Sequence, residues 1–335
     1  MLSTEISIRP TEGSPGIAPT AWLRLAVLPA LIVLMEAGFS TVHSDVLTAR
    51  NLVNVFQQST YLIVFAAAQM VVILTRGFDL SLGTTVSAVS VASALVMTSL
   101  AAGGVPDPVT VAAGIAVGLG LALLVGLFNG VFVAWFNVNP FVATLGSLNI
   151  ALGIATTISG GNPVFNVPNA FSNFLDGKIF GVLVPLVVAG ALCIALYFLL
   201  GYTVFGRSLY LIGNNPRAAR LAGLPSVRYL TIAYITCSLL AAFGSLMLTA
   251  RTGSGEPDLG GSLMLESIAA AVIGGVSLQG GIGGIVQVIF GAVFITMLSN
   301  GMDLLQVSGY IQEITLGCVI IVAVYLDRLW TARTQ

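Results

Sequence analysis

The sequence predicts an all-α protein, a polytopic membrane helix bundle with about ten transmembrane helices and a short cytoplasmic coupling helix. Hydrophobic residues make up 57% of the 335 residues and charged residues only 7%, whereas a soluble domain usually carries about a quarter charged residues. The apolar runs approach the roughly 20 residues that a helix needs to cross hydrocarbon, and brief polar turns separate them. We therefore expect helices rather than a barrel. The net charge of −1 gives no indication of a nucleic-acid partner.

The apolar runs divide the chain into one membrane domain with two tails. Residues 1–20 are polar and proline-containing, and we expect them to form a disordered cytoplasmic tail. Residues 21–328 form a single transmembrane domain, and residues 329–335 form a cytoplasmic C-terminal tail. The expected spans are Trp22–Phe39, Asn51–Leu74, Thr84–Leu100, Val109–Phe136, Phe141–Ser159, Phe180–Leu200, Leu230–Ala250, Leu263–Gly284, Ile285–Leu298 and Gly309–Leu326.

One of these spans is ambiguous. At a rise of about 1.5 Å per residue, Leu263–Gly275 covers only about half of a bilayer, and Val276–Gly284 is rich in glycine. The segment is either a short span or a re-entrant piece buried in protein. If it did not cross, the basic residues that come after the last span would lie outside, against the positive-inside rule.

Residues 201–229 form a connection that contains Arg207, Arg217, Arg220 and Arg228 and no acidic residue. Positive charge is retained on the cytoplasmic side of a membrane. The connection comes after an even number of spans, so the charge pattern places it and both termini in the cytoplasm.

A short helix is predicted inside this connection. Asn215 suits the N-cap, Pro216 suits the first helical position, and Gly223 and Pro225 stop the helix. A helix this short is not stable by itself in water. Two interpretations stay open: it lies on the membrane surface, or it docks into another protein. For docking, the candidate residues are Arg207, Asn215, Pro216, Arg217, Ala218, Ala219, Arg220 and Gly223.

The residue types argue against an enzyme. The chain has no phosphate-binding G-x-x-x-x-G-K-[ST] loop, a single lysine (Lys178) and a single histidine (His43). Three widely spaced cysteines lie in apolar runs and predict neither a metal site nor a disulfide framework. We expect no cofactor on this chain, and any ATP would be hydrolysed by another polypeptide.

Polar residues inside the spans are costly and need a reason. Those that we consider for a solute path are Gln69, Asn129, Thr144, Asn149 and Glu266. Hydrogen bonds between helices explain the amides and hydroxyls equally well. Glu266 also suits the positive end of a helix dipole, and Asp79 could cap a helix or pair with Arg76.

Four segments carry a family resemblance. Gly77–Gly83 (G-F-D-L-S-L-G) resembles the G-I-D-L-S-V-G signature of the ribose/xylose-type permeases of bacterial ABC importers, with Gly77, Asp79, Ser81 and Gly83 matching. Residues 139–146 (N-P-F-V-A-T-L-G) are similar to that family's P-x-F-I-A-T-L-G segment. Residues 205–223 resemble its F-G-R…G-x-N-x-x-A-A-x-x-x-G loop, and Ile268–Gly281 its I-A-A-V-V-I-G-G-x-S-L-x-G-G. The chain departs from the family at Glu266, where an aspartate is usual, and at Ile282, where a basic residue is usual.

The resemblance implies a permease subunit of the bacterial inner membrane for a sugar or a similar small polar solute. It implies three partners: a second permease copy or paralogue, ABC ATPase subunits below, and a periplasmic or lipid-anchored binding protein above. Asn215–Gly223 would be the helix that contacts the ATPase. Other solutes (a polyol, a signalling furanosyl compound, a nucleoside or an amino acid) and a stand-alone secondary carrier remain the alternatives.

Overall fold

A computed structural model describes residues 19–334, and the side chains of residues 27–325. Residues 1–20 were predicted to be disordered; residues 1–18 lie outside the described residues, whereas Pro19 and Thr20 belong to a helix. The described chain forms thirteen α-helices, one 3-10 helix and one small hairpin. They are α1 Pro19–Val42, η1 Ser44–Leu47, α2 Ala49–Ile73, α3 Leu82–Ala102, α4 Asp107–Ala134, α5 Pro140–Ser159, α6 Asn169–Leu175, β1 Lys178–Ile179, β2 Val182–Leu183, α7 Val184–Tyr202, α8 Val204–Asn214, α9 Pro216–Leu221, α10 Ser226–Thr252, α11 Leu263–Ile273, α12 Ile285–Leu304 and α13 Gly309–Thr334.

The long helices confirm a polytopic helical membrane protein. Within the described residues, seven helices are long and apolar enough to cross a membrane: α2, α3, α4, α5, α7, α10 and α12. Three shorter apolar segments lie in α1, α11 and α13. All ten coincide with the apolar runs from which the spans were predicted.

Several helix boundaries differ from the predicted spans, and three of the differences change an expected connection or tail. Phe180 does not begin a helix, because Phe180 and Gly181 both have positive φ and form the turn between β1 and β2. Most of the connection after α7 is helical and contains a separate helix, α8. Thr203 caps this helix, because its hydroxyl accepts a hydrogen bond from Gly206 N at 3.2 Å. The last helix, α13, continues to Thr334 through most of the predicted tail.

The ambiguous segment is entered by a non-helical stretch made mostly of turns, residues 253–262, that runs antiparallel beside α3. Glu256 N donates to Ser90 Oγ at 3.2 Å, and Gly260 N donates to Ser87 Oγ at 3.0 Å. A Cβ on Gly260 would lie 1.9 Å from the carbonyl oxygen of Gly83, at the start of α3.

From Ser90 to Gly83 the stretch runs along about 10 Å of helix, and the 11 residues of α11 add about 16 Å. The sum approaches the thickness of a hydrocarbon core, about 30 Å. Non-helical backbone is tolerated inside a membrane only where protein satisfies it, as Ser87 and Ser90 do here. Whether the segment crosses the membrane completely stays a prediction.

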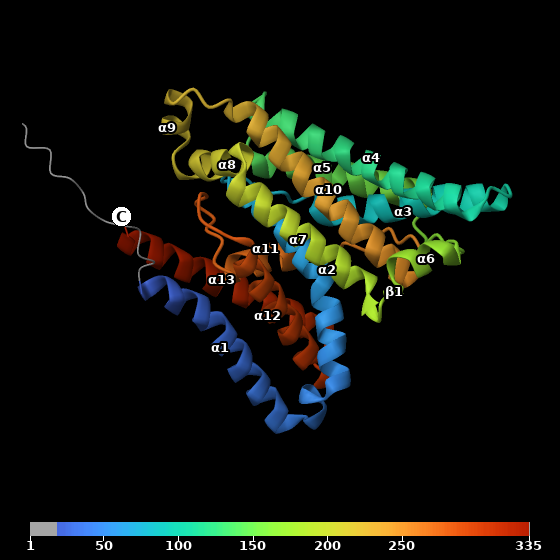
Figure 1. The fold of residues 1–335 in the computed structure, drawn as a ribbon, viewed down its shortest axis with the longest axis horizontal. Helices are drawn as coiled ribbons and strands as arrows, with labels where there is room; N and C mark the ends of the chain where they lie inside the picture. The colour runs from blue at the N-terminus through green and yellow to red at the C-terminus, as the bar shows by residue number, and fades with distance from the viewer. Residues whose placement is uncertain (1–18, 335) are drawn as a thin grey trace, which may run out of the picture.

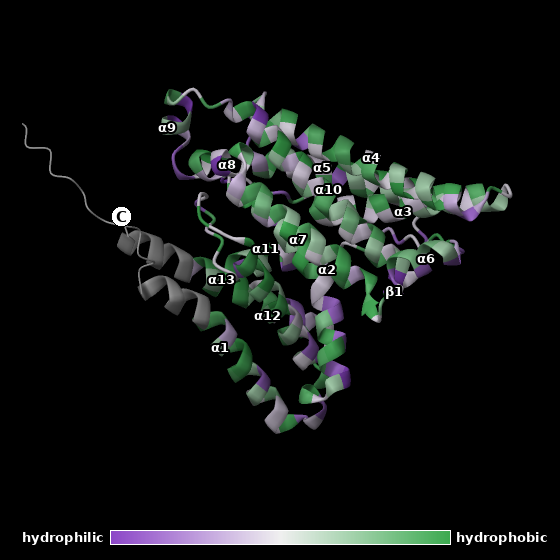
Figure 2. Cartoon of the chain, in the orientation of Figure 1, coloured by the Kyte–Doolittle hydropathy of each residue, from purple (hydrophilic) through white to green (hydrophobic). Residues whose placement is uncertain are grey.

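The helices pack around α2, which is buried along most of its length. It contacts α10, α11, α12 and α7, while α3 and α4 complete the bundle against α10. Figure 1 shows α9 at one end of the molecule and α6 with β1 at the opposite end, and the start of α1 and the end of α13 lie on the same side of the view as α9. Figure 2 shows hydrophilic residues gathered at α9 and near β1, whereas the flanks of the long helices are hydrophobic.

Candidate functional site: the α9 foot and the junction behind it

The predicted short helix is present, and we call residues 215–223 the α9 foot. The side-chain oxygen of Asn215 accepts hydrogen bonds from Arg217 N at 3.1 Å and from Ala218 N at 3.0 Å. Pro216 is the first helical residue. Gly223 has φ +75°, in the left-handed region that stops a helix. Local signals therefore determine both ends of this helix.

The foot projects from the bundle. Ala219 is buried against the rest of the chain, but Arg217, Arg220 and Leu221 are exposed, and Leu221 is 90% exposed. Neither arginine side chain hydrogen-bonds or pairs with a described residue. Two unpaired cations beside an exposed leucine make a surface suited to an acidic partner with an apolar pocket.

Replacing Asn215 with alanine is expected to weaken the foot. Loss of an N-cap costs about 1 kcal/mol, and α9 contacts little besides α8. Faster hydrogen exchange at the amides of Arg217 and Ala218 in detergent-solubilised protein would report the fraying. Asn215→Asp should exchange at the wild-type rate, because its carboxylate still accepts both bonds; equal rates in all three proteins would contradict the cap.

Directly behind the foot, three segments that are distant in the sequence meet. We call residues 74–76, 213–214 and 280–283 the junction. Arg76 Nε donates to Gly213 O at 2.5 Å, and its Nη2 donates to Asn214 O at 2.8 Å. Gly281 N donates to Leu74 O at 2.9 Å. The junction thus ties the end of α2 and the glycine-rich segment before α12 to the last residues of α8.

The junction requires glycine because backbones touch there. A Cβ on Gly213 would lie 1.9 Å from Leu74 O and 2.4 Å from Gly281 N. Nearby, Tyr210 OH donates to Gly283 O at 2.8 Å. Burial raises the pKa of the Tyr210 phenol above its usual value, which keeps the donor protonated.

Beyond the junction, the signature segment turns into the bundle and is fixed by a buried polar cluster. Asp79 is fully buried, and its Oδ1 accepts from Ser81 N at 2.9 Å and from Ser81 Oγ at 2.5 Å. Asn129 Nδ2 donates to Ser81 Oγ at 2.9 Å. With its amide oriented to satisfy both partners, Gln69 pairs with the backbone N and O of Asp79 at 3.2 and 3.3 Å.

Of the two roles considered for Asp79, pairing with Arg76 does not occur, since the guanidinium bonds the end of α8 and the carboxylate bonds Ser81 inside the bundle. The signature glycines allow this path. A Cβ on Gly77 would meet Tyr234 OH at 2.7 Å, and one on Gly83 would meet Gly260 O at 2.4 Å.

The path candidates do not form one surface. Gln69 and Asn129 join the Asp79 cluster, and Thr144 is buried, with its hydroxyl donating to Pro140 O. Asn149 lies on the exposed face of α5, and Glu266 is half-buried in the first turn of α11. Whether any of them lines a path stays a prediction.

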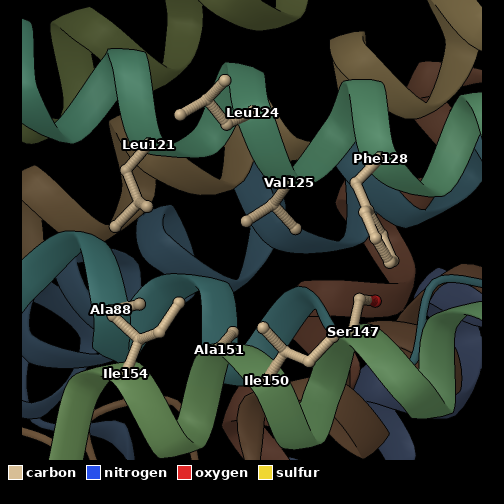
Figure 3. A pocket seen from close by; sticks show the side chains of 9 residues that line it. All are labelled: Ala88, Leu121, Leu124, Val125, Phe128, Ser147, Ile150, Ala151 and Ile154. Carbon is tan, nitrogen blue, oxygen red and sulfur yellow. The ribbon is translucent and has the colours of Figure 1, made fainter. Parts of the chain in front are cut away.

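A groove of about 200 Å³ lies between α4 and α5, over α3. Figure 3 shows its lining: Ala88, Leu121, Leu124, Val125, Phe128, Ser147, Ile150, Ala151 and Ile154. Its one side-chain hydroxyl, on Ser147, already donates to Thr144 O. A site for a polar molecule needs several hydrogen-bonding groups that converge on it. The apolar lining of this groove suits contact with hydrocarbon chains and does not suit a polar ligand.

Sequence reasoning missed three contributors. Tyr234, whose hydroxyl donates to Phe78 O at 3.3 Å, lies in an ordinary apolar run that carries no signal. The contact between Gly213 and Gly281 is invisible without the fold. The exposure of Leu221 could have been found, because a leucine that directly follows Arg220 on a short surface helix is unusual.

Comparisons with known proteins agree with these features. The profile of the family described as "Branched-chain amino acid transport system / permease component" matches residues 51–324. The ribose import permease protein RbsC of Escherichia coli K12 is 36% identical over 312 residues, covering 92% of this chain and 94% of RbsC. The D-allose transport system permease protein AlsC of the same strain is 32% identical over 329 residues, covering 98% of both chains.

A third relative is RbsC of Bacillus subtilis, 34% identical over 309 residues, with 92% of this chain and 91% of the relative covered. No solved structure matches significantly. The family profile covers the signature segment, the α9 foot and the glycine-rich segment before α12, which are the parts that meet at or behind the junction. The chain is thus a membrane-spanning member of the branched-chain amino acid transport system / permease component family.

Proposed function

We propose that this chain is the permease subunit of an ABC importer of the bacterial inner membrane and that it translocates a sugar or a similar small polar solute. A periplasmic binding protein delivers the solute, and a separate ATPase subunit drives transport. The observation that carries the proposal is the α9 foot, which offers Arg217, Arg220 and Leu221 at one end of the bundle. Relatives whose names state ribose or allose transport support the solute class.

The proposed mechanism is mechanical. ATP-driven closure of the partner pushes the foot, and the foot moves α8 because Asn215 directly joins the two helices. The junction passes this movement to the end of α2 and to the segment before α12. Ends of several spans therefore shift together, as alternation between inward and outward states requires.

We place the solute path on the exposed face of α5. Asn149 lies there with Gly146 and Gly153, beside which a Cβ would meet open space. A polar and small-residue stripe is out of place against lipid. It fits a second permease copy or paralogue facing it across a hydrated path. The departures at Glu266 and Ile282 leave a polyol, furanosyl compound, nucleoside or amino acid as alternative solutes.

Reconstitution tests the function. Proteoliposomes that contain this chain, its ATPase and its binding protein are expected to accumulate radiolabelled ribose or allose only when ATP is present on the side that corresponds to the cytoplasm. Vesicles with this chain alone form the control. Uptake by the chain alone under a sodium or proton gradient would overturn the proposal and establish a secondary carrier.

A further inference from the structure

Resting on the proposed function, we propose that Arg76 is the positioning residue that transmits movement of the α9 foot to the buried signature segment. Its side chain bonds the end of α8 and its backbone continues directly into residues 77–81. Arg76 thus connects the surface helices α8 and α9, through its side chain, to the interior of the bundle, through its backbone.

The guanidinium of Arg76 contacts the C-terminal end of α8. It bonds the carbonyls of Gly213 and Asn214, the last two residues of α8, immediately before Asn215 caps α9. These carbonyls carry the negative end of the helix dipole and lack partners within the helix. Two donors from one planar group define an orientation as well as a distance, so rotation of the α8 end is passed to Arg76.

The backbone of Arg76 is also unusual for an arginine. Its φ is +66°, a region that favours glycine, and Gly77 N donates back to Val72 O at 3.2 Å to close α2. An arginine in this helix-stopping position is strained, and such strain concentrates at functional positions. Glycine would suit the backbone better, so the side chain is the reason for arginine here.

Beyond Arg76, the chain leads straight into the buried polar cluster. Within three residues it reaches Asp79, which is bonded by Ser81, the residue before α3, and by Gln69 of α2. Tyr234 of α10 bonds the carbonyl of Phe78 on the way. A displacement of Arg76 is therefore transmitted to the start of α3 through Asp79 and Ser81, and to α10 through Phe78 and Tyr234. Each step is a covalent or hydrogen-bonded contact.

The test uses the complete importer in proteoliposomes and measures solute imported per ATP hydrolysed. Arg76→Gln and Arg76→Gly are expected to lower this ratio by at least about tenfold, within the usual range of coupling energies, while the ATPase still co-purifies. Arg76→Lys should recover part of the ratio, because an ammonium donates to a carbonyl but lacks the planar fork. Arg228→Gln, an exposed arginine outside the foot and the junction, is the matched control.

Arg76→Gly also separates coupling from folding, since glycine accepts φ +66° without strain. If Arg76→Gln fails to fold, the ratio of solute imported to ATP hydrolysed is compared in the glycine and lysine variants alone. A wild-type ratio in Arg76→Gly would overturn the inference and leave the proposed function standing, as would loss of ATPase binding in all three variants. Wild-type transport that needs no ATPase would instead overturn the proposed function.

Discussion

Reversal of Arg217 and Arg220 to glutamate is expected to release the ATPase and abolish ATP-driven uptake. Both guanidinium groups are exposed and bond no described residue, so a partner that faces them must supply the compensating negative charge. The reversal turns attraction into repulsion at the centre of the proposed contact. We expect each single variant to lower ATPase affinity by at least about tenfold, or ~1.4 kcal/mol, measured by co-purification and by titration in detergent.

Arg228→Glu is the control for this prediction. Arg228 is exposed in the first turn of α10 and carries the same charge change outside the foot. Reversing positive charge beside a membrane span can also disturb insertion, so labelling of an introduced cysteine from one side of the membrane should verify topology. Unchanged ATPase binding in both single variants, with correct topology, would show that docking occurs elsewhere.

Gly213→Ala is expected to destabilise the protein, although it adds a single methyl group to α8. In an exposed helix, alanine is better than glycine by about 1 kcal/mol. Here the added carbon would lie 1.9 Å from Leu74 O and 2.4 Å from Gly281 N, which are backbone atoms that cannot rotate away. The junction must open, at a cost of about 1–3 kcal/mol or more, and the thermal midpoint in detergent should fall.

Gly201→Ala provides the comparison. Gly201 lies near the end of α7, and a Cβ there would meet nothing within 4 Å. Its thermal midpoint should equal or exceed that of the wild type. A Gly213→Ala variant as stable as Gly201→Ala would mean that the three segments of the junction are not in backbone contact.

Much of the fold could be read from the sequence because it depends on local chemistry. Apolar runs located the seven candidate membrane spans and the three shorter apolar helices of the described residues, and Asn215, Pro216 and Gly223 located α9 almost to the residue. Helix caps and stops act over three or four neighbouring residues, so their signals are complete within the local sequence. Phe180 misled for the same reason: an apolar residue extended a run that a hairpin turn interrupts.

Local sequence signals predicted only part of the candidate site. Gln69 and Asn129 were recognised as polar groups that needed partners, and the structure shows these partners to be Asp79 and Ser81. From the sequence alone, Arg76 could form an ion pair with Asp79, three residues away. Its true partners, the carbonyls of Gly213 and Asn214, lie in a segment that no local rule connects to it.

By itself, the sequence determined that this protein is a helical membrane bundle with a short, capped, arginine-bearing helix between two spans. Length, hydropathy and capping are properties of contiguous residues, and each acts before the chain folds on itself. Only the tertiary structure decided that the non-helical residues 253–262 line α3 and that Arg76 meets the end of α8. Both arrangements depend on backbones approaching at glycine pairs such as Gly83 with Gly260 and Gly213 with Gly281, and a glycine does not encode which distant glycine it will touch.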